Sequence, residues 1–447
     1  MNLHRRIGWK RTAALSALTI AFAVSVANSA PQPYVLQAST CDGYPRVDIG
    51  MSEGLCAGLV MAPKDGAFGK RQIKTPRVLF QLDDAKSWLV TDLGGWTANR
   101  GRIWLMKVTG PREVELQALV SKLTLPHTLA TGPDGKVYVA EMNRIFRLNT
   151  AEGTTETVVD GLPGNRLHIG RHPISHFVFD RNGDLLVNVG ADTDQCANDK
   201  GAPKADVCAE SGGDDARAVI RRYRYLGASK WDTRHSVIAR GLRNSLVLIR
   251  HSSGTLLQGE NSYDFAPAAD KPYDEINQIR EGANYGWPYC YDADRTTPAW
   301  TGMKVMDCAS SAHEKPVSML PPHAAPLGAA YYSGAMFPAL EGKLLMGLHG
   351  YRPGGSRIVA FDVDAKGVPV PAQRSRFAEY TADGKVVMKP YDTGPAAEPR
   401  ILTPGWDLKA GIRPAGAPVG LTIARDGAIW VADDRNAAIL RIAADRP

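Results

Sequence analysis

The stretch Leu129-Ala-Thr-Gly-Pro-Asp-Gly-Lys-Val-Tyr-Val-Ala140 contains two short apolar segments separated by an Asp-Gly dipeptide. Such dipeptides tolerate the positive φ angles that tight hairpins require, so this stretch predicts two antiparallel strands joined by a turn. The apolar residues 144–148 follow closely and would add a third strand. If this unit is repeated, it decides the fold class.

The same pattern returns along the chain. Residues 176–190 (HFVFDRNGDLLVNVG) and 419–432 (VGLTIARDGAIWVA) each place an Asn-Gly or Asp-Gly turn between apolar segments. Three less regular copies begin near Val78, Leu246 and Ala329. Repeats of about 40–50 residues with short strands are typical of β-propellers. We therefore predict an all-β fold, a six-bladed β-propeller with long inter-strand loops; the alternative is a β-sandwich with a second domain.

The first thirty residues differ from the rest. A basic start is followed by the apolar run 13–26 and then by small residues, Ala27-Asn-Ser29. This pattern predicts a signal peptide over residues 1–30 and a periplasmic or secreted protein, with an N-terminal membrane anchor as the alternative. Residues 31–447 would then form a single propeller domain.

The charge and hydropathy of the chain exclude two function classes. The formal net charge is +7, and the four basic residues before position 13 belong to the leader, which leaves about +3 for the remainder. That excess is too small to indicate nucleic-acid binding. No segment after the leader is long and apolar enough to predict a membrane span.

The six cysteines lie in three close pairs along the sequence. In an exported chain, such cysteines predict disulfides. The favoured pairing is Cys41–Cys56, Cys196–Cys208 and Cys290–Cys308, although the sequence leaves other pairings open. A zinc site is disfavoured, because no Cys-x-x-Cys spacing occurs.

A histidine-containing stretch could supply a proton acceptor. Residues 170–179 (GRHPISHFVF) place His172 on a loop that leads into a predicted strand. A histidine can accept a proton near neutral pH. His168 and His176 compete for this role, and for each histidine the alternative is a purely structural one.

Two further stretches could bind ligands. Arg243 and Asn244 offer a fork of guanidinium donors and an amide, which could hold an anionic, oxygen-rich ligand; the alternative is a surface arginine beside a turn. The segments 258–261 (QGEN) and 273–277 (YDEIN) collect carboxylates and loop carbonyls, the ligands that calcium prefers. The candidate calcium ligands are the carbonyls of Gly259 and Glu260 and the carboxylates of Asp274 and Glu275; the alternative is a set of strand caps and turns.

In this order, the motifs resemble those of the soluble quinoprotein glucose dehydrogenase family, which includes aldose sugar dehydrogenases and sorbosone-dehydrogenase-like proteins. The sequence D-E-I-N at 274–277 and N-Y-G-W-P at 284–288 carry the resemblance, which extends roughly from Pro126 to the C-terminus. The stretch 322–328 (PHAAPLG) is similar to the sorbosone-dehydrogenase-like branch.

The resemblance implies a six-bladed propeller with pyrroloquinoline quinone (PQQ) on its top face. By motif, His172 matches the family's catalytic base, and Arg243 and Asn244 match cofactor contacts. Gly259 and Glu260 stand where backbone carbonyls bind the calcium that also touches the quinone. The histidine would take the proton of a substrate hydroxyl while hydride passes to the quinone.

Several positions depart from the family pattern. Glu260 replaces a proline, residues 265–272 form an insertion, and Leu246 replaces a glutamine. Ala417 and Val419 stand where arginines are expected. Three other arginines are therefore the candidates for the cationic cluster that holds the cofactor: Arg357 first, then Arg352, with Arg413 near the last blade.

The sequence thus predicts a PQQ- and calcium-dependent oxidoreductase, a quinoprotein sugar dehydrogenase. It would oxidise a sugar or a sugar-like alcohol or hemiacetal and pass electrons to an acceptor that the sequence does not identify. The alternatives are a calcium-dependent lactonase and a non-catalytic propeller that binds carbohydrate or protein, because propellers host many functions.

Overall fold

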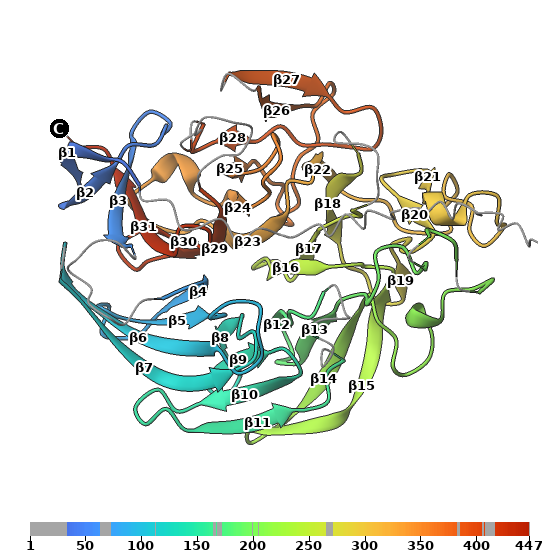
Figure 1. Ribbon diagram of the computed structural model, residues 1–447, viewed down its shortest axis with the longest axis horizontal. Helices are drawn as coiled ribbons and strands as arrows, with labels where there is room; N and C mark the ends of the chain where they lie inside the picture. Colours follow the sequence, from blue (N-terminus) through green and yellow to red (C-terminus); the bar gives the residue numbers. More distant parts are fainter. Residues whose placement is uncertain are drawn as a thin grey trace, which may run out of the picture. The chain divides into compact units, whose positions relative to one another are not determined.

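The strands of the computed structural model form six blades around a common centre (Figure 1). The structure describes residues 34–62, 73–111, 113–163, 167, 172–198, 200–203, 205–264, 271–381, 385–404, 406 and 416–446. Over these ranges the fold is all-β with only short 3-10 helices, at Ala209–Ser211, Pro298–Trp300 and Pro338–Leu340. No helix in them is long and apolar enough to cross a membrane. The predicted six-bladed β-propeller is confirmed.

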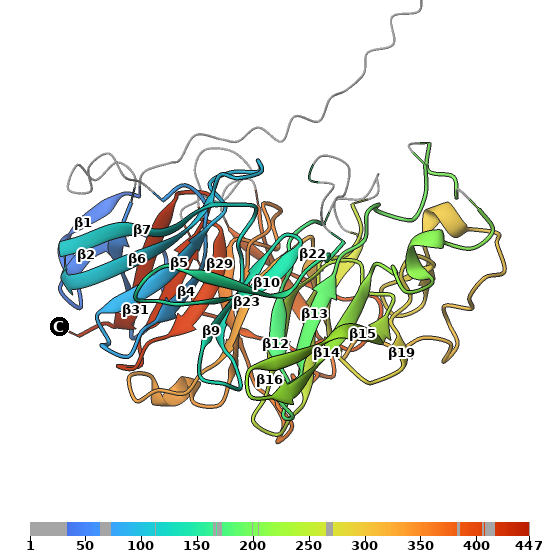
Figure 2. The same ribbon diagram turned by 90° about the horizontal axis from the view of Figure 1, so that it is seen from below.

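Blades 1 to 5 each contain four antiparallel strands in chain order, and blades 3 and 6 have additional strands. Blade 1 contains β4 (Pro76–Gln81), β5 (Ser87–Asp92), β6 (Gly101–Gly110) and β7 (Glu113–Leu123). Blade 2 contains β8 (Leu129–Thr131), β9 (Val137–Glu141), β10 (Arg144–Leu148) and β11 (Thr155–Val159). Blade 3 contains β12 (Phe177–Phe179), β13 (Leu185–Val189), β14 (Val219–Gly227) and β15 (Lys230–Arg240), side by side in Figure 2, and β19 (Ala283–Asn284) pairs in parallel with β15.

The later blades carry the longer insertions. Blade 4 contains β16 (Ser245–Arg250), β17 (Leu256–Glu260), β18 (Tyr273–Gln278) and β22 (Ser318–Pro322). Blade 5 contains β23 (Pro326–Tyr331), β24 (Leu344–Leu348), β25 (Arg357–Phe361) and β28 (Arg400–Ile401). Two separate hairpins, β20 (Cys290–Tyr291) with β21 (Arg295–Thr296) and β26 (Arg376–Tyr380) with β27 (Val386–Pro390), lie in these insertions.

The N-terminal segment closes the ring. Blade 6 contains β29 (Pro418–Ile423), β30 (Ile429–Asp433) and β31 (Ala438–Ala444), followed by β3 (Leu55–Met61), β2 (Tyr44–Val47) and β1 (Leu36–Cys41). The strand β3 pairs with β31 along its whole length, so the two ends of the described chain share one sheet. The bond Cys41–Cys56 fastens β1 to β3, and the predicted bonds Cys196–Cys208 and Cys290–Cys308 are also present.

The hairpin predicted at residues 129–140 shows why these residues form strands. Leu129 pairs with Val139 and Thr131 with Val137, on either side of the Asp-Gly turn. Tyr138 and Val139 are fully buried, on opposite faces of the strand, because each blade packs against a neighbour on both sides. The alternation of apolar and polar residues along the strand is therefore weak, and the turn dipeptides mark the strands in the sequence.

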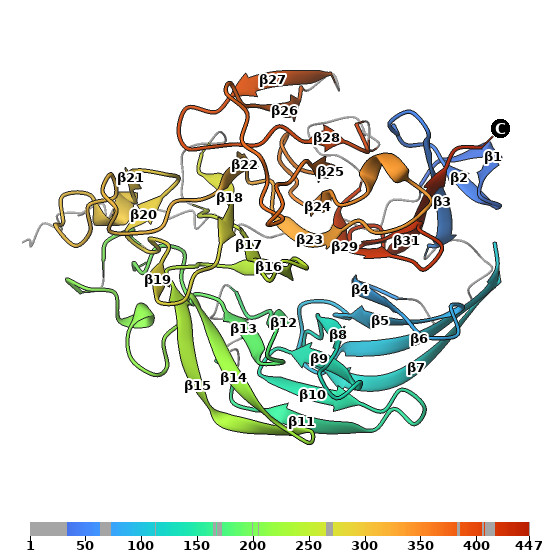
Figure 3. The same cartoon turned by 180° about the vertical axis from the view of Figure 1, so that it is seen from behind.

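The first strands β4, β8, β12, β16, β23 and β29 surround the centre of the ring (Figure 3). Because they run in the same direction, the loops before each first strand and the loops between each second and third strand lie at one end. We call this end the site face. The loops between the third and fourth strands lie at the opposite end.

An apolar plug lies at the site face. It consists of one or two buried side chains from each blade or the loop before it: Leu93, Leu125, Met142, Ile174, Leu246, Leu327 and Val419. Two members, Leu246 and Val419, occupy positions where the family pattern led us to expect glutamine and arginine. Val419 is completely buried, so these positions contribute to the core and supply no polar group to a ligand.

Candidate functional site

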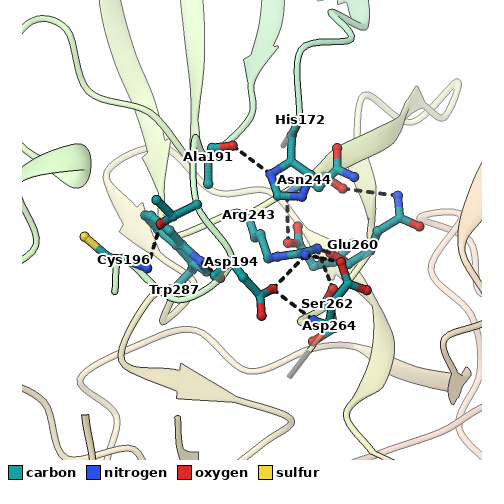
Figure 4. Close-up of polar contacts among 12 residues, drawn as sticks. His172, Ala191, Asp194, Cys196, Arg243, Asn244, Glu260, Ser262, Asp264 and Trp287 are labelled. Carbon is teal, nitrogen blue, oxygen red and sulfur yellow. Dashed lines mark hydrogen bonds and ion pairs between the residues drawn. The ribbon is translucent and has the colours of Figure 1, made fainter. Parts of the chain in front are cut away.

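His172 and Arg243 converge at the site face (Figure 4). His172 Nδ1 lies 2.7 Å from the carbonyl oxygen of Ala191, and the Ala191 N–H donates to the carbonyl oxygen of Arg243 at 2.8 Å. A carbonyl oxygen only accepts, so Nδ1 carries the proton and Nε2 is the basic nitrogen of the neutral ring. Gly190 permits this approach, because a Cβ there would lie 2.6 Å from His172 Cβ.

The Arg243 guanidinium lies in a cage of oxygens. Its Nη1 donates to the carbonyls of Asn261 at 2.8 Å and Ser262 at 2.5 Å, and its Nη2 lies 2.8 Å from carboxylate oxygens of Asp194 and Asp264. Burial acts to lower the pKa of Arg243, but the two aspartates and Glu260 outweigh it and the pKa is raised. The buried Nε has no partner among the described residues.

Asn244 and Glu260 join the ends of β16 and β17. The Asn244 N–H donates to Glu260 Oε1 at 2.9 Å, and Gln258 Nε2 donates to Glu260 Oε2 at 2.5 Å. Burial raises the pKa of Glu260 to about 7, although Asn244, Arg243 and Gln258 act in the other direction. Both carboxyl oxygens of Glu260 are therefore already engaged by the protein.

Asp274 and Glu275 are adjacent on β18 and point to opposite faces of blade 4. Asp274 accepts hydrogen bonds from the N–H groups of Ser262 at 2.8 Å and Ala325 at 2.6 Å, one at each oxygen. Glu275 lies directly opposite Glu260 in the ladder, and burial together with Glu260 raises its pKa well above the usual value. Within the described ranges, no group of three or more His, Cys, Asp or Glu side chains is arranged to hold a metal.

Two of the three candidate arginines, Arg357 and Arg352, lie in the part of the chain that the structure describes. Arg357 is buried, donates to the carbonyls of Pro353, Gly355 and Ala378, and stacks on Tyr380 at 4.3 Å, so it ties its own loop to the hairpin β26–β27. Arg352 is exposed. Arg413 lies outside the described residues, as do His168 and the predicted signal peptide.

A second polar cluster lies at the site face, and the sequence analysis missed it. Asp434, on the β30–β31 loop, accepts from Arg77 Nη1 at 2.5 Å and from His349 Nε2 at 2.8 Å. Tyr351 lies beside His349, and the Arg435 guanidinium lies over the Tyr351 ring at 5.3 Å. Burial acts to raise the pKa of Asp434, but His349 and Arg77 lower it. We call these five residues the Arg77 cluster.

His176, a competitor for the role of base, is part of the protein interior. Its Nε2 donates to the carbonyl of Leu248 at 3.2 Å, and its Nδ1 accepts from the Thr128 hydroxyl at 2.9 Å. Both ring nitrogens are satisfied in the neutral form. Burial lowers the pKa of His176 to about 4.

We therefore expect His176 to make the protein sensitive to acid. An unfolded histidine titrates near 6.5, so between about pH 6.5 and pH 4 the unfolded state binds more protons and stability falls as the pH falls. The pKa difference corresponds to at most about 3 kcal/mol, at about 1.4 kcal/mol per pKa unit. Urea unfolding should show that the free energy of unfolding falls less between pH 7.5 and pH 4.5 for His176→Gln than for wild type. His235→Gln, on β15, is the control, and an equal loss in wild type and His176→Gln would contradict the assignment.

The segment of the chain that contains the site is similar to a known family. Residues 165–368 match the family model described as Glucose / Sorbosone dehydrogenase. Over this segment, which is less than half of the chain, the sequence is similar to the glucose/sorbosone dehydrogenase family. The segment contains His172, Arg243, Asn244 and the four candidate calcium ligands. An uncharacterised protein of Borreliella burgdorferi is 27% identical over an alignment of 257 residues. The match covers 52% of this chain and 60% of that protein, less than two thirds of its length.

Several solved structures share the fold of this chain. The holo form of the pyranose dehydrogenase PQQ domain from Coprinopsis cinerea is 18% identical, with a TM-score of 0.62 over 90% of this chain and 99% of that chain. The calcium structure of a Trichoderma reesei carbohydrate-active enzyme of family AA12 is 19% identical, with a TM-score of 0.62 over 93% and 100%. The PQQ-bound aldose sugar dehydrogenase from Streptomyces coelicolor is 16% identical, with a TM-score of 0.52 over 88% and 100%.

Proposed function

We propose that the protein is a PQQ- and calcium-dependent dehydrogenase that oxidises a sugar or a sugar-like alcohol or hemiacetal. The convergence of His172, Arg243 and Asn244 at one end of the ring, inside the segment that matches the family, is the observation that carries the proposal. The three disulfides support a periplasmic or secreted location, because such bonds persist in oxidising compartments.

The site face suits a planar, anionic cofactor. The Nε groups of Arg243 and Arg77 are buried without a partner among the described residues, and each could donate to a carboxylate or a quinone oxygen. The Arg77 cluster supplies the guanidinium groups of Arg77 and Arg435, from blades 1 and 6, and the imidazole of His349, from blade 5, whereas Ala417 and Val419 supply no cation. The apolar plug offers a floor for a flat ring. We propose that Arg243, Asn244, Arg77, His349 and Arg435 hold PQQ.

Calcium would depend on main-chain oxygens. Because both side-chain oxygens of Glu260 and of Asp274 already accept hydrogen bonds, the carbonyls of Gly259 and Glu260 are the better candidates. Glu275, which accepts one hydrogen bond from Asn277, is a further carboxylate candidate. Bound PQQ would supply the hydride acceptor, and bound calcium would supply the Lewis acid that polarises it.

The protein's own contribution is a base and its orientation. His172 Nε2 would take the proton of the substrate hydroxyl, which raises the electron density on the oxygen and favours loss of hydride from the adjacent carbon. The Ala191 carbonyl fixes the ring through Nδ1–H and would stabilise the imidazolium that forms. The Ala191 N–H bond to Arg243 keeps the base in register with the residues proposed to hold the cofactor.

The test is a reconstitution. The purified protein would be mixed with PQQ, calcium chloride or both, and dye reduction would be followed with a panel of aldoses and polyols. We expect dye reduction only when both are present, and loss of activity on chelation of calcium. Calcium-dependent cleavage of a lactone without quinone would instead support a hydrolase, and binding of sugars with no dye reduction under any condition would support a non-catalytic propeller.

A further inference from the structure

The loop between β5 and β6 presents an exposed tryptophan at the site face. Leu93, at the start of this loop, is fully buried in the apolar plug. Trp96 follows three residues later, and 49% of its surface is exposed. A tryptophan buries a large apolar area when it contacts a partner, so an isolated exposed tryptophan on a functional face indicates a binding residue.

The base of this loop is held firmly. Asp92 Oδ1 accepts from the N–H groups of Thr75 at 2.8 Å and Gly94 at 2.9 Å. Gly94 has a φ of +66°, and a Cβ there would lie 2.1 Å from the carbonyl oxygen of Arg100. At the other end, the Asn99 N–H donates to Thr124 Oγ1 at 3.1 Å. Because both ends are fixed, the exposure of Trp96 follows from the loop's conformation.

The loop lies within reach of the proposed cofactor. The plug that contains Leu93 also contains Ile174 and Leu246, which are each two residues from His172 and Asn244. Three residues of extended chain span about 10 Å. A molecule that lies above the plug and extends from His172 toward blade 1 would therefore come within reach of the loop that carries Trp96.

The residues next to Trp96 indicate the chemistry of the occupant. Thr97, Asn99 and Arg100 are also exposed, and they offer a hydroxyl, an amide and a guanidinium within four residues of the ring. A pyranose can contact both an aromatic ring and polar groups. One face of the sugar carries C–H groups, which the negative face of an aromatic ring attracts, and its edge carries hydroxyls.

We propose that Trp96 stacks on the pyranose ring of the substrate and makes the protein favour cyclic sugars over open-chain polyols. This inference rests on the proposed function, since it assigns a substrate class to the same site. An open-chain polyol has no flat apolar face, so it would gain little from the Trp96 ring. Trp96 binds and positions; the proton transfer remains with His172.

The first test measures sugar binding without turnover. Saturation-transfer NMR would be recorded with methyl β-D-glucopyranoside and with sorbitol, on the protein without quinone and on the protein loaded with PQQ and calcium. We expect transfer to the glycoside ring protons in wild type and Trp96→Phe, and an affinity loss of about tenfold or more in Trp96→Ala. Leu226→Ala is the matched control, because Leu226 is 59% exposed near the end of β14, at the opposite end of the ring.

The second test separates this inference from the proposed function. If the protein is active, Trp96→Ala should raise KM for glucose about tenfold, leave kcat within about twofold, and leave KM for sorbitol unchanged. Active protein with an unchanged KM for glucose overturns the role of Trp96 and leaves the dehydrogenase standing. Saturation transfer that depends on Trp96 in a protein without any dye reduction supports sugar binding and overturns the dehydrogenase. Equal transfer in wild type and Trp96→Ala, or none in wild type, overturns the inference.

Discussion

We expect replacement of His172 by alanine to lower kcat for PQQ-dependent dye reduction by a factor of about 10²–10⁴, the usual contribution of a positioned general base. The reason is specific to the geometry. The Ala191 carbonyl holds Nδ1–H at 2.7 Å and leaves Nε2 as the basic nitrogen. Steady-state kinetics with the best sugar of the panel would measure the loss.

The controls distinguish the loss of the base from a loss of folding or of cofactor binding. His235→Ala, which replaces a histidine on β15 outside the candidate site, should keep wild-type activity. Calorimetry should show that His172→Ala still binds PQQ. The activity of His172→Ala should recover in part with added imidazole. Full activity in His172→Ala would show that another group accepts the proton.

Replacement of Arg243 by methionine has the largest expected effect on stability. The change leaves the carboxylates of Asp194 and Asp264 and two carbonyls facing an apolar side chain. Removing one partner of a buried ion pair costs about 3–5 kcal/mol, because the remaining charge stays buried without compensation. Denaturant unfolding of the two proteins would measure this loss, which we expect toward the lower figure because Asp264 is well exposed.

An exposed arginine provides the matched control. Arg234→Met removes a guanidinium that is 90% exposed and paired with Asp232, and it should change stability by less than about 1 kcal/mol. The double variant Arg243→Met/Asp194→Asn should be less destabilised than the sum of its single changes. A loss below about 1 kcal/mol for Arg243→Met would contradict the buried cage.

Local features of the fold could be predicted because short-range chemistry determines them. The Asp-Gly and Asn-Gly turns mark the hairpins of blades 2, 3 and 6, and the close spacing of the cysteines indicates the three disulfides. The segment around β3 could not be assigned to a blade, because its pairing with β31 joins residues almost 400 positions apart. No local pattern records such a contact.

The candidate site also contains some features that the sequence predicted and others that it did not. Its histidine and arginine–asparagine pair precede strands, and a propeller brings the starts of its first strands to one end, so their convergence followed from repeats and motifs. The role of Arg357 could not be predicted from repeats and motifs, because its burial depends on the hairpin β26–β27 packing over it. No sequence motif predicted the Arg77 cluster, because Arg77 and Asp434 are 357 residues apart in the chain.

The sequence by itself determined the turns, the repeat and the family motifs and favoured the disulfide pairing that the structure contains, because all of these depend on residues close together in the chain. Only the tertiary structure decided which charged groups meet, which carboxylates are already hydrogen-bonded and which expected polar positions belong to the apolar plug. The physical reason is that burial, ion pairing and orientation are properties of neighbours in space. Those neighbours are set when six sheets close into a ring.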